Sequence, residues 1–149
     1  MNSIIIRQAT AQDAPSIMPL MIELGYSLEL SELESRIEIY SGPNDIVLVA
    51  DEGGEVIGFV SFHMIPLFHA PGNLGRITAM SISAQHQRKG IGKALLEKLE
   101  DHALNRGCVR IEVTSGDHRK DDAHIFYLSC GYAKDSRRFQ KMLSKENQH

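Results

Sequence analysis

The stretch that decides the fold is Ser83-Ala-Gln-His-Gln87-Arg88-Lys89-Gly90-Ile91-Gly92-Lys93-Ala94. It joins an apolar, strand-like segment to a helix whose apolar residues Ile91, Leu95 and Leu99 recur every four positions. A helix start leaves about four backbone N–H groups without partners and carries roughly half a positive charge, which favours an anion. The two glycines of the stretch let a ligand approach these groups without meeting a Cβ. The junction therefore predicts an anion site, and its several donors favour a diphosphate.

Known phosphate-loop motifs do not match this stretch. It is neither GxxxxGK[ST] nor GxGxxG, and it has no Lys-Ser or Lys-Thr pair that could hold Mg²⁺. Arg88, Lys89 and Lys93 add side-chain charge to the backbone donors. The plain alternative is a solvated basic patch around two packing glycines. The strand before the glycines and the amphipathic helix after them favour the anion site.

Outward from this junction, strand and helix signals follow each other along the chain. Apolar runs and alternation predict strands at residues 4–6, 46–50, 56–63, 75–83, 109–113 and 139–143. Capping residues and helical periodicity predict helices at residues 10–25, 31–42, 90–105 and 121–130. The turn Glu52-Gly53-Gly54-Glu55 predicts a β-hairpin, and residues 66–73 read as a loop between two strands. The expected order is β-α-α-β-β-β-α-β-α-β.

Length and composition limit the classes of protein. The 149 residues predict one domain over residues 1–149, with residues 145–149 as a frayed polar tail. A net charge of -3 argues against nucleic acid or an anionic membrane surface as a partner. No apolar stretch approaches the ~20 residues that span a bilayer, and the N-terminus does not resemble a secretory leader. A cytoplasmic location is therefore expected.

Two motifs resemble those of a known family. Residues 87–92, Gln-Arg-Lys-Gly-Ile-Gly, are similar to the (Gln/Arg)-x-x-Gly-x-(Gly/Ala) motif of the GNAT superfamily of acyl-CoA-dependent N-acetyltransferases. Asp122-Ala-His-Ile-Phe-Tyr127, followed by Cys130-Gly-Tyr132, resembles the second signature of that superfamily. The resemblance covers essentially the whole chain and implies the α/β GNAT fold, a mixed and mostly antiparallel sheet flanked by helices. Within the superfamily, this helix and the region of His63 and His69 resemble aminoalkylphosphonate N-acetyltransferases.

The resemblance implies a site for acetyl-CoA as co-substrate. The pyrophosphate would be held by backbone amides of residues 87–93, and the pantetheine arm would pair like an added strand with the end of the strand before them. Where relatives often carry an Asn that contacts pantetheine, this chain has Lys120; this residue, or Arg119 beside it, would reach a phosphate instead. The implied cofactor-binding residues are Met80, Ser81, Ile82, Gln87, Arg88, Lys89, Gly90, Ile91, Gly92, Lys93, Lys120 and Tyr127.

The implied chemistry is direct attack of a primary amine on the thioester carbonyl in a ternary complex. Tyr127 would be the general acid that protonates the CoA thiolate, because a phenol with a pKa near 10 is neutral at pH 7 and close to a thiol near 8.5. Relatives commonly use a glutamate on the fourth strand as the base, but the aligned position here is Ala79. The alternative bases are Glu112, His63, His69 and His118. A water chain, or an amine of low pKa, would also serve.

The acceptor and the assembly are less closely specified. A small-molecule amine is expected rather than a protein terminus. The seven histidines show no HExxH motif and no zinc-ligand spacing, so no metal is expected. Many relatives form homodimers, and the sequence leaves the oligomeric state open. Two rival functions are a non-catalytic acyl-CoA sensor with the same fold and a nucleotide-binding regulatory module.

Overall fold

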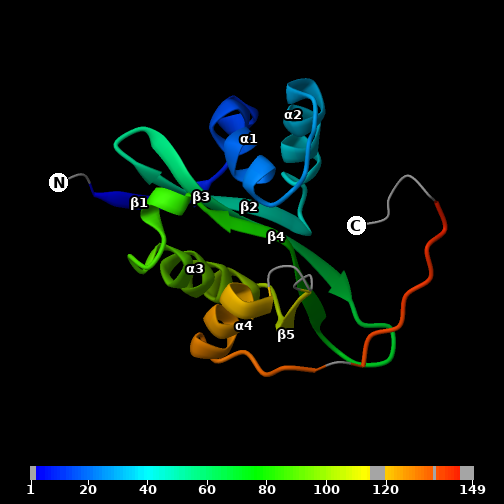
Figure 1. The fold of residues 1–149 in the computed structure, drawn as a ribbon. Helices are drawn as coiled ribbons and strands as arrows, with labels where there is room; N and C mark the ends of the chain where they lie inside the picture. The colour runs from blue at the N-terminus through cyan, green and yellow to red at the C-terminus, as the bar shows by residue number, and fades with distance from the viewer. Residues whose placement is uncertain (1–2, 115–119, 136, 145–149) are drawn as a thin grey trace. The chain divides into compact units, whose positions relative to one another are not determined.

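The computed structural model describes residues 3–114, 120–135 and 137–144. The chain divides into two compact units, residues 1–114 and residues 115–149. The first unit contains a five-stranded sheet and the helices α1, α2 and α3, and the second contains α4 (Figure 1).

The sheet of the first unit has the strands in chain order. They are β1 (Ile4–Gln8), β2 (Asp45–Glu52), β3 (Glu55–Pro66), β4 (Asn73–Ile82) and β5 (Cys108–Val113). The first three pairings are antiparallel, and β4 pairs with β5 in parallel. A parallel pair needs a crossover connection, which α3 (Ile91–Asn105) supplies. The sheet is therefore mixed and mostly antiparallel, as expected.

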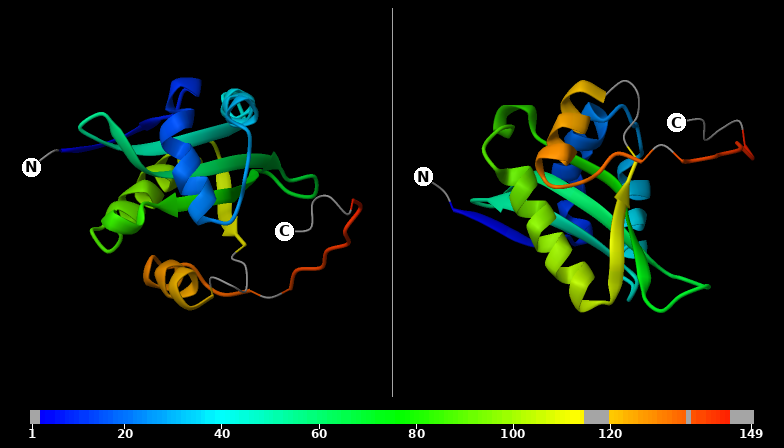
Figure 2. Two further views of the ribbon diagram at one scale, coloured as in Figure 1. Left: turned by 45° about the horizontal axis from the view of Figure 1, so that its top comes forward. Right: turned by 90° about the horizontal axis from the view of Figure 1, so that it is seen from below.

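Helices cover both faces of this sheet. The helices α1 (Ala14–Glu23) and α2 (Leu30–Ile39) lie on one face, and α3 lies on the other (Figures 1 and 2). On the first face, Ile17 and Leu33 belong to one buried cluster with Val49 and Phe59 of the sheet. The residues of α3 that recur every four positions, from Ile91 to Leu99, are 3% exposed or less. Full burial of each such side chain stabilises the fold by about 1.5–3 kcal/mol, so the periodicity that predicted α3 also holds it to the sheet.

Two irregularities set the register among β2, β3 and β4, and a third lies between Asn73 and Leu74 in the pairing of β4 with β5. The hairpin turn between β2 and β3 is confirmed, with Gly53 and Gly54 at φ values of 61° and 95°. A register shift then lies between Ala50 and Asp51, and the extra residue is on β3. A second shift inserts Thr78 into β4. A β-bulge bends its strand and moves every later side chain onto a new partner.

The second unit differs from the expectation at its end. The helix α4 (Lys120–Ser129) is present and begins one residue before the predicted start. Residues 139–143, expected as a last strand, form neither helix nor strand, and Phe139 and Leu143 are 97% and 93% exposed. Alternation of apolar residues makes a strand only where a neighbouring strand supplies hydrogen bonds, and none pairs with these residues in the part of the chain that the structure describes.

Candidate active site

The loop between β4 and α3 leads into a helix start without a side-chain cap. Arg88 and Gly90 have φ values of 66° and 80°, and α3 begins after Gly90 with no side-chain cap. The first hydrogen bond of the helix runs from the amide of Ala94 to the carbonyl of Gly90, at 3.0 Å. The amides of the first turn, at residues 91–93, therefore lack helical partners. Successive amides in such turns can form an anion-binding concavity, which is the kind of site that the sequence predicts for this loop.

The side chains of the loop agree with this reading. Arg88, Lys89 and Lys93 are exposed, while Ile91 and Gly92, the first two residues of α3, are buried. The side-chain Nε2 of Gln87 donates to the carbonyl of Ile82 at 3.2 Å and so ties the loop to the end of β4. The predicted cofactor residues from position 80 to position 93 thus form one continuous segment of the first unit.

The strands β4 and β5 part in the middle of β4. Their pairing runs from Asn73 opposite Cys108 to Ile77 opposite Val113. Beyond Ile77, residues 79–82 pair with β3, and β5 no longer pairs with β4. An extended ligand can add to the edge of a sheet as a further strand. The family resemblance implies the pantetheine arm at this end of β4.

A row of polar side chains crosses the sheet just before this point. It consists of Asp45, His63, Arg76 and Glu112, which stand opposite one another on four successive strands. Nδ1 of His63 contacts the carboxylate of Asp45. Arg76 donates to Glu112 at 2.8 Å, and Arg110 donates to the other oxygen of Glu112 at 2.8 Å. We call Asp45, His63, Arg76 and Glu112 the polar row. They lie on the face of the sheet that α1 and α2 cover, beside the apolar cluster under these helices.

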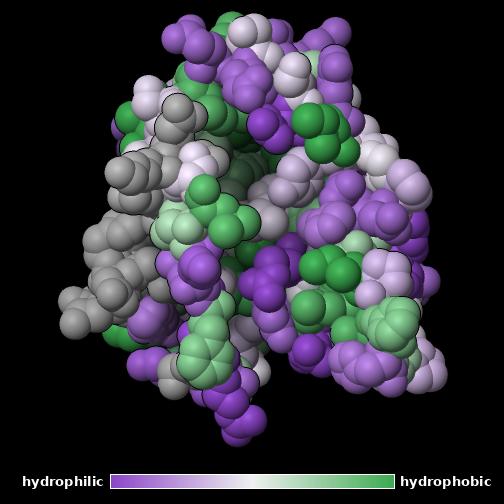
Figure 3. All heavy atoms as spheres, turned by 90° about the vertical axis from the view of Figure 1, so that its right-hand side faces the viewer, coloured by the Kyte–Doolittle hydropathy of each residue, from purple (hydrophilic) through white to green (hydrophobic). Residues whose placement is uncertain are grey.

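Three hydroxyl groups meet at the bulge of β4. Oγ of Ser61 lies 2.7 Å from Oγ1 of Thr78, and the hydroxyl of Tyr40 lies 3.0 Å from the same atom. Tyr40 directly follows α2, so the three linked hydroxyl groups connect the helix layer to β3 and β4. The bulge of β4 is therefore held by a linked group of hydroxyl side chains. On the face drawn in Figure 3, hydrophilic and hydrophobic side chains are intermixed.

The candidate bases differ in their surroundings. His63 and Glu112 both belong to the polar row. His69 is exposed on the loop that follows β3. His118 lies outside the described residues. Sequence reasoning missed Asp45, Arg76 and the hydroxyl group of Thr78, because only the strand register shows what they face.

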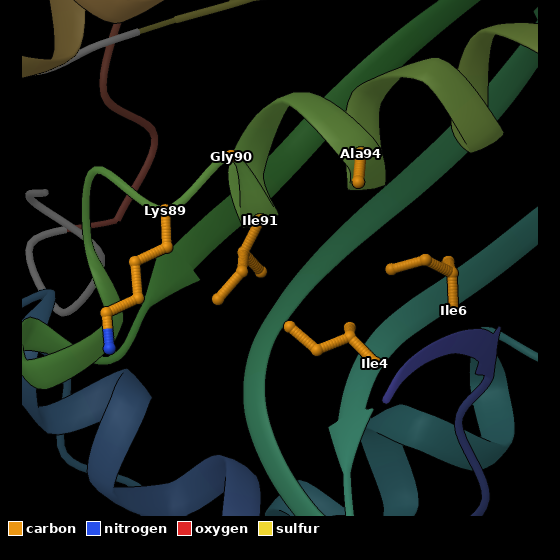
Figure 4. Close-up of a pocket in the computed structure, with 6 residues that line it drawn as sticks. All are labelled: Ile4, Ile6, Lys89, Gly90, Ile91 and Ala94. Atoms are coloured by element: carbon orange, nitrogen blue, oxygen red, sulfur yellow. The ribbon is translucent and has the colours of Figure 1, made fainter. Parts of the chain in front are cut away.

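A hollow of about 200 Å³ lies on the other face of the sheet, beside the start of α3. Its walls come from Ile4 and Ile6 of β1 and from Ile91 and Ala94 of α3, whose side chains converge on it (Figure 4). Lys89 lines it too, but its side chain extends away from the aliphatic groups. The lining residues include no carboxylate and no imidazole.

The second unit contains the predicted proton donor. Tyr127 lies on α4, half-buried, with its ring centroid 5.2 Å from that of Phe126 and 5.8 Å from that of Tyr132. Lys120 is the first residue of the same helix.

In the first unit, burial raises the pKa of the Cys108 thiol, which disfavours the thiolate that a covalent route would need.

The described residues contain no group of three or more His, Cys, Asp or Glu side chains placed to hold a metal ion. Within the same ranges, every helix is too short or too polar to cross a bilayer.

Comparison with known proteins places the chain in a family. The Acetyltransferase (GNAT) family matches residues 14–132, and the chain belongs to it. The GNAT fold class expected from the sequence is confirmed, and so is the resemblance carried by the glycine loop and by α4. The protein is an acyltransferase of the GNAT type, with N-acetyltransferases as its relatives.

Individual relatives act on different amines. The chain is 32% identical over 141 residues to the aminoalkylphosphonate N-acetyltransferase of Salmonella typhimurium, covering 93% of this chain and 90% of that protein. It is 28% identical to the aminoglycoside N(6')-acetyltransferase type 1 of Stenotrophomonas maltophilia, covering 89% and 88%. In fold it resembles an aminoglycoside N-acetyltransferase solved with CoA, with a TM-score of 0.84, 13% identity and 97% of each chain covered.

Proposed function

We propose that the protein transfers the acetyl group of acetyl-CoA to a small-molecule primary amine, by direct attack in a ternary complex. The observation that carries this is the loop from Gln87 to Lys93, with its uncapped helix start and its basic side chains, in a chain of the GNAT family. The whole chain acts as one functional domain in this proposal. The loop would hold the diphosphate, and the end of β4 from which β5 has parted would hold the pantetheine arm.

Tyr127 supplies the proton for the CoA thiolate in this proposal. Its support is the match of residues 122–127 to the family signature and the suitability of a neutral phenol for the task. No covalent intermediate on Cys108 or Cys130 is required, because the amine attacks the thioester itself.

The experiment is release of free thiol from acetyl-CoA with a panel of amines. We expect turnover with at least one small amine, and we expect Tyr127→Phe to lower kcat by about 100-fold or more while the Kd for CoA changes less than about twofold. CoA binding without thiol release from any amine would favour the acyl-CoA sensor. Stabilisation of the fold by ATP but not by CoA would favour the nucleotide-binding module.

The acceptor that we propose carries an acidic group close to its amine. At the β5 end of the polar row, two guanidinium groups, of Arg76 and Arg110, share the single carboxylate of Glu112, so this end is locally cationic. Over the row with Arg110, the carboxylate of Asp45 at the other end balances this charge. Guanidinium groups bind phosphonate and carboxylate groups through paired hydrogen bonds. Of the two relatives above, one acts on an aminoalkylphosphonate and the other on an aminoglycoside, which carries several ammonium groups. The cationic pair favours the first kind of acceptor.

Two amines of similar size separate these acceptors, 2-aminoethylphosphonate with an acidic group and propylamine without one. We expect wild-type kcat/KM to favour the phosphonate by about 10-fold or more, and Arg76→Met to remove most of this preference. Arg36→Met is the matched control, because Arg36 pairs with Glu32 on the exposed side of α2. Equal use of both amines by the wild-type protein would contradict the acidic acceptor but not the acetyl transfer.

A further inference from the structure

The acceptor amine needs a proton acceptor. An alkylamine with a pKa of about 10.4 is only about one part in 2,500 free base at pH 7, which adds about 4.6 kcal/mol to the barrier unless something removes the proton. The position where the family resemblance puts a carboxylate holds Ala79. Another group of this chain must therefore do the work, or solvent must.

His63 has the hydrogen-bonding arrangement of a proton acceptor. Nδ1 of His63 contacts a carboxylate oxygen of Asp45, its direct neighbour on β2. A neutral imidazole that donates from Nδ1 carries its lone pair on Nε2. Within the described ranges, Nε2 of His63 makes no hydrogen bond, and the side chain is 44% exposed. Asp45 is 19% exposed, so the pair is anchored on the sheet and open at the ring.

The place of His63 on the sheet also suits this role. Arg76 stands opposite His63, and Thr78 is two residues further along β4, at the point where β5 has parted. The hydroxyl chain of Thr78 and Ser61 shows that the side chain of Thr78 is on the same face as that of Ser61, which is two residues before His63 on β3. Diagonal neighbours across antiparallel strands are about 7–8 Å apart, a distance that an imidazole and one amine or water can span.

The other candidate bases are less suited. Each oxygen of Glu112 accepts a hydrogen bond from a guanidinium group, one from Arg76 and one from Arg110. That carboxylate is directed along the sheet rather than toward a ligand. His69 is exposed on the β3–β4 loop, and its ring makes no hydrogen bond or ion pair with another residue that the structure describes.

We infer that Nε2 of His63 removes the proton from the acceptor amine, directly or through one water, and that Asp45 positions the imidazole. This inference rests on the proposed function. The ammonium gives one proton to Nε2, and the nitrogen lone pair forms the C–N bond to the thioester carbonyl carbon. The C–S bond then breaks, and the thiolate takes the phenol proton of Tyr127. The nitrogen loses its second proton to the phenolate, and His63 passes the first to solvent, so the reaction releases one proton overall.

The test compares His63→Gln, Asp45→Asn and the double variant, assayed with 2-aminoethylphosphonate and with propylamine. We expect His63→Gln to lower kcat by about 100-fold or more and to leave the KM for acetyl-CoA within about twofold. Asp45→Asn should lower kcat less, and the double variant should be no slower than His63→Gln alone, because the aspartate acts only through the ring. Added imidazole should restore part of the activity of His63→Ala.

Two histidine variants serve as comparisons. His102→Gln on α3 should keep wild-type kcat, and a large loss in His69→Gln with an active His63→Gln would assign the role to the loop instead. The inference is overturned if His63→Gln keeps kcat within about threefold of wild type, or if the losses of the two single variants multiply in the double variant. If the wild-type protein acetylates neither amine nor any other of the panel, the proposed function itself fails. Thermal unfolding of each variant shows that the fold is retained.

Discussion

At position 75 the packing of the core leaves no room for a side chain larger than that of glycine. A Cβ built on it would lie 2.3 Å from Cζ of Phe62, which is fully buried. We expect Gly75→Ala to reduce the free energy of unfolding by about 1–3 kcal/mol, because the core must shift to admit a methyl group. Urea unfolding monitored by circular dichroism measures this. In Gly42→Ala the nearest atom would be 3.8 Å away, so this control should change stability by less than about 0.5 kcal/mol.

A second substitution separates overpacking from any backbone effect at this residue. Phe62→Leu removes the ring atoms that the new methyl group would meet. Combined with Gly75→Ala, it should destabilise the fold by less than the two single changes added together. Full additivity would show that the cost of Gly75→Ala has another cause.

At the scale of elements, the start of α3 carries the cofactor proposal. Gly90 has a φ of 80° and no atom within 4 Å of a built Cβ, so Gly90→Ala meets no obstacle except its backbone conformation. We expect it to cost about 1–2 kcal/mol of stability or to move the amides of the loop, and to weaken CoA binding by about 10-fold or more in calorimetric titration.

Gly25, after α1, is the matched control for this prediction. Its φ is 95°, and it too has nothing within 4 Å of a built Cβ. Gly25→Ala should therefore cost a similar amount of stability and leave the Kd for CoA unchanged. Equal weakening of CoA binding in both variants would mean that the loop has no special part in holding the cofactor.

At the scale of the whole molecule, one ion cluster should govern stability in acid. Asp13 accepts hydrogen bonds from Arg7 at 2.8 and 2.9 Å and from the amide of Thr10 at 2.8 Å. The hydrogen bonds from Arg7 are the main cause of a lowered pKa of the Asp13 carboxyl, with the amide of Thr10 adding to it and burial opposing it. A lowered folded-state pKa gives stability that is complete above the unfolded value of about 3.9 and is lost as the pH falls through the folded value.

The measurement is the free energy of unfolding of Asp13→Asn from pH 7 to pH 2. We expect the variant to be less stable than wild type by about 1–3 kcal/mol at pH 7, with the difference shrinking below about pH 4. Glu32→Gln removes an exposed pair with Arg36 and should change stability by less than about 0.5 kcal/mol at any pH. A difference for Asp13→Asn that is constant with pH would rule out the carboxylate charge as its source.

Much of the architecture follows from local signals in the sequence. The spacing of Ile91, Leu95 and Leu99 predicted α3, and the double glycine of the turn predicted the β2–β3 hairpin. The glycine loop before α3 predicted an anion site. Each of these predictions depends only on residues close together in the chain. The strand expected at residues 139–143 failed for the opposite reason. Its alternation says which side chains would share a face, but a strand forms only with hydrogen bonds from another part of the chain.

Which residues stand opposite one another in the polar row depends on the tertiary structure alone. Counting outward from the hairpin turn without irregularities would place Asp45 opposite Phe62, whose ring is in the core on the other face. The register shift near Ala50 puts His63 there instead, and the insertion of Thr78 puts Arg76 opposite His63. Each bulge adds one residue to one strand and so exchanges the faces of every residue beyond it. The sequence by itself determined the class of fold and the glycine loop before α3, whereas the polar row depends on register shifts between strands that no local pattern predicts.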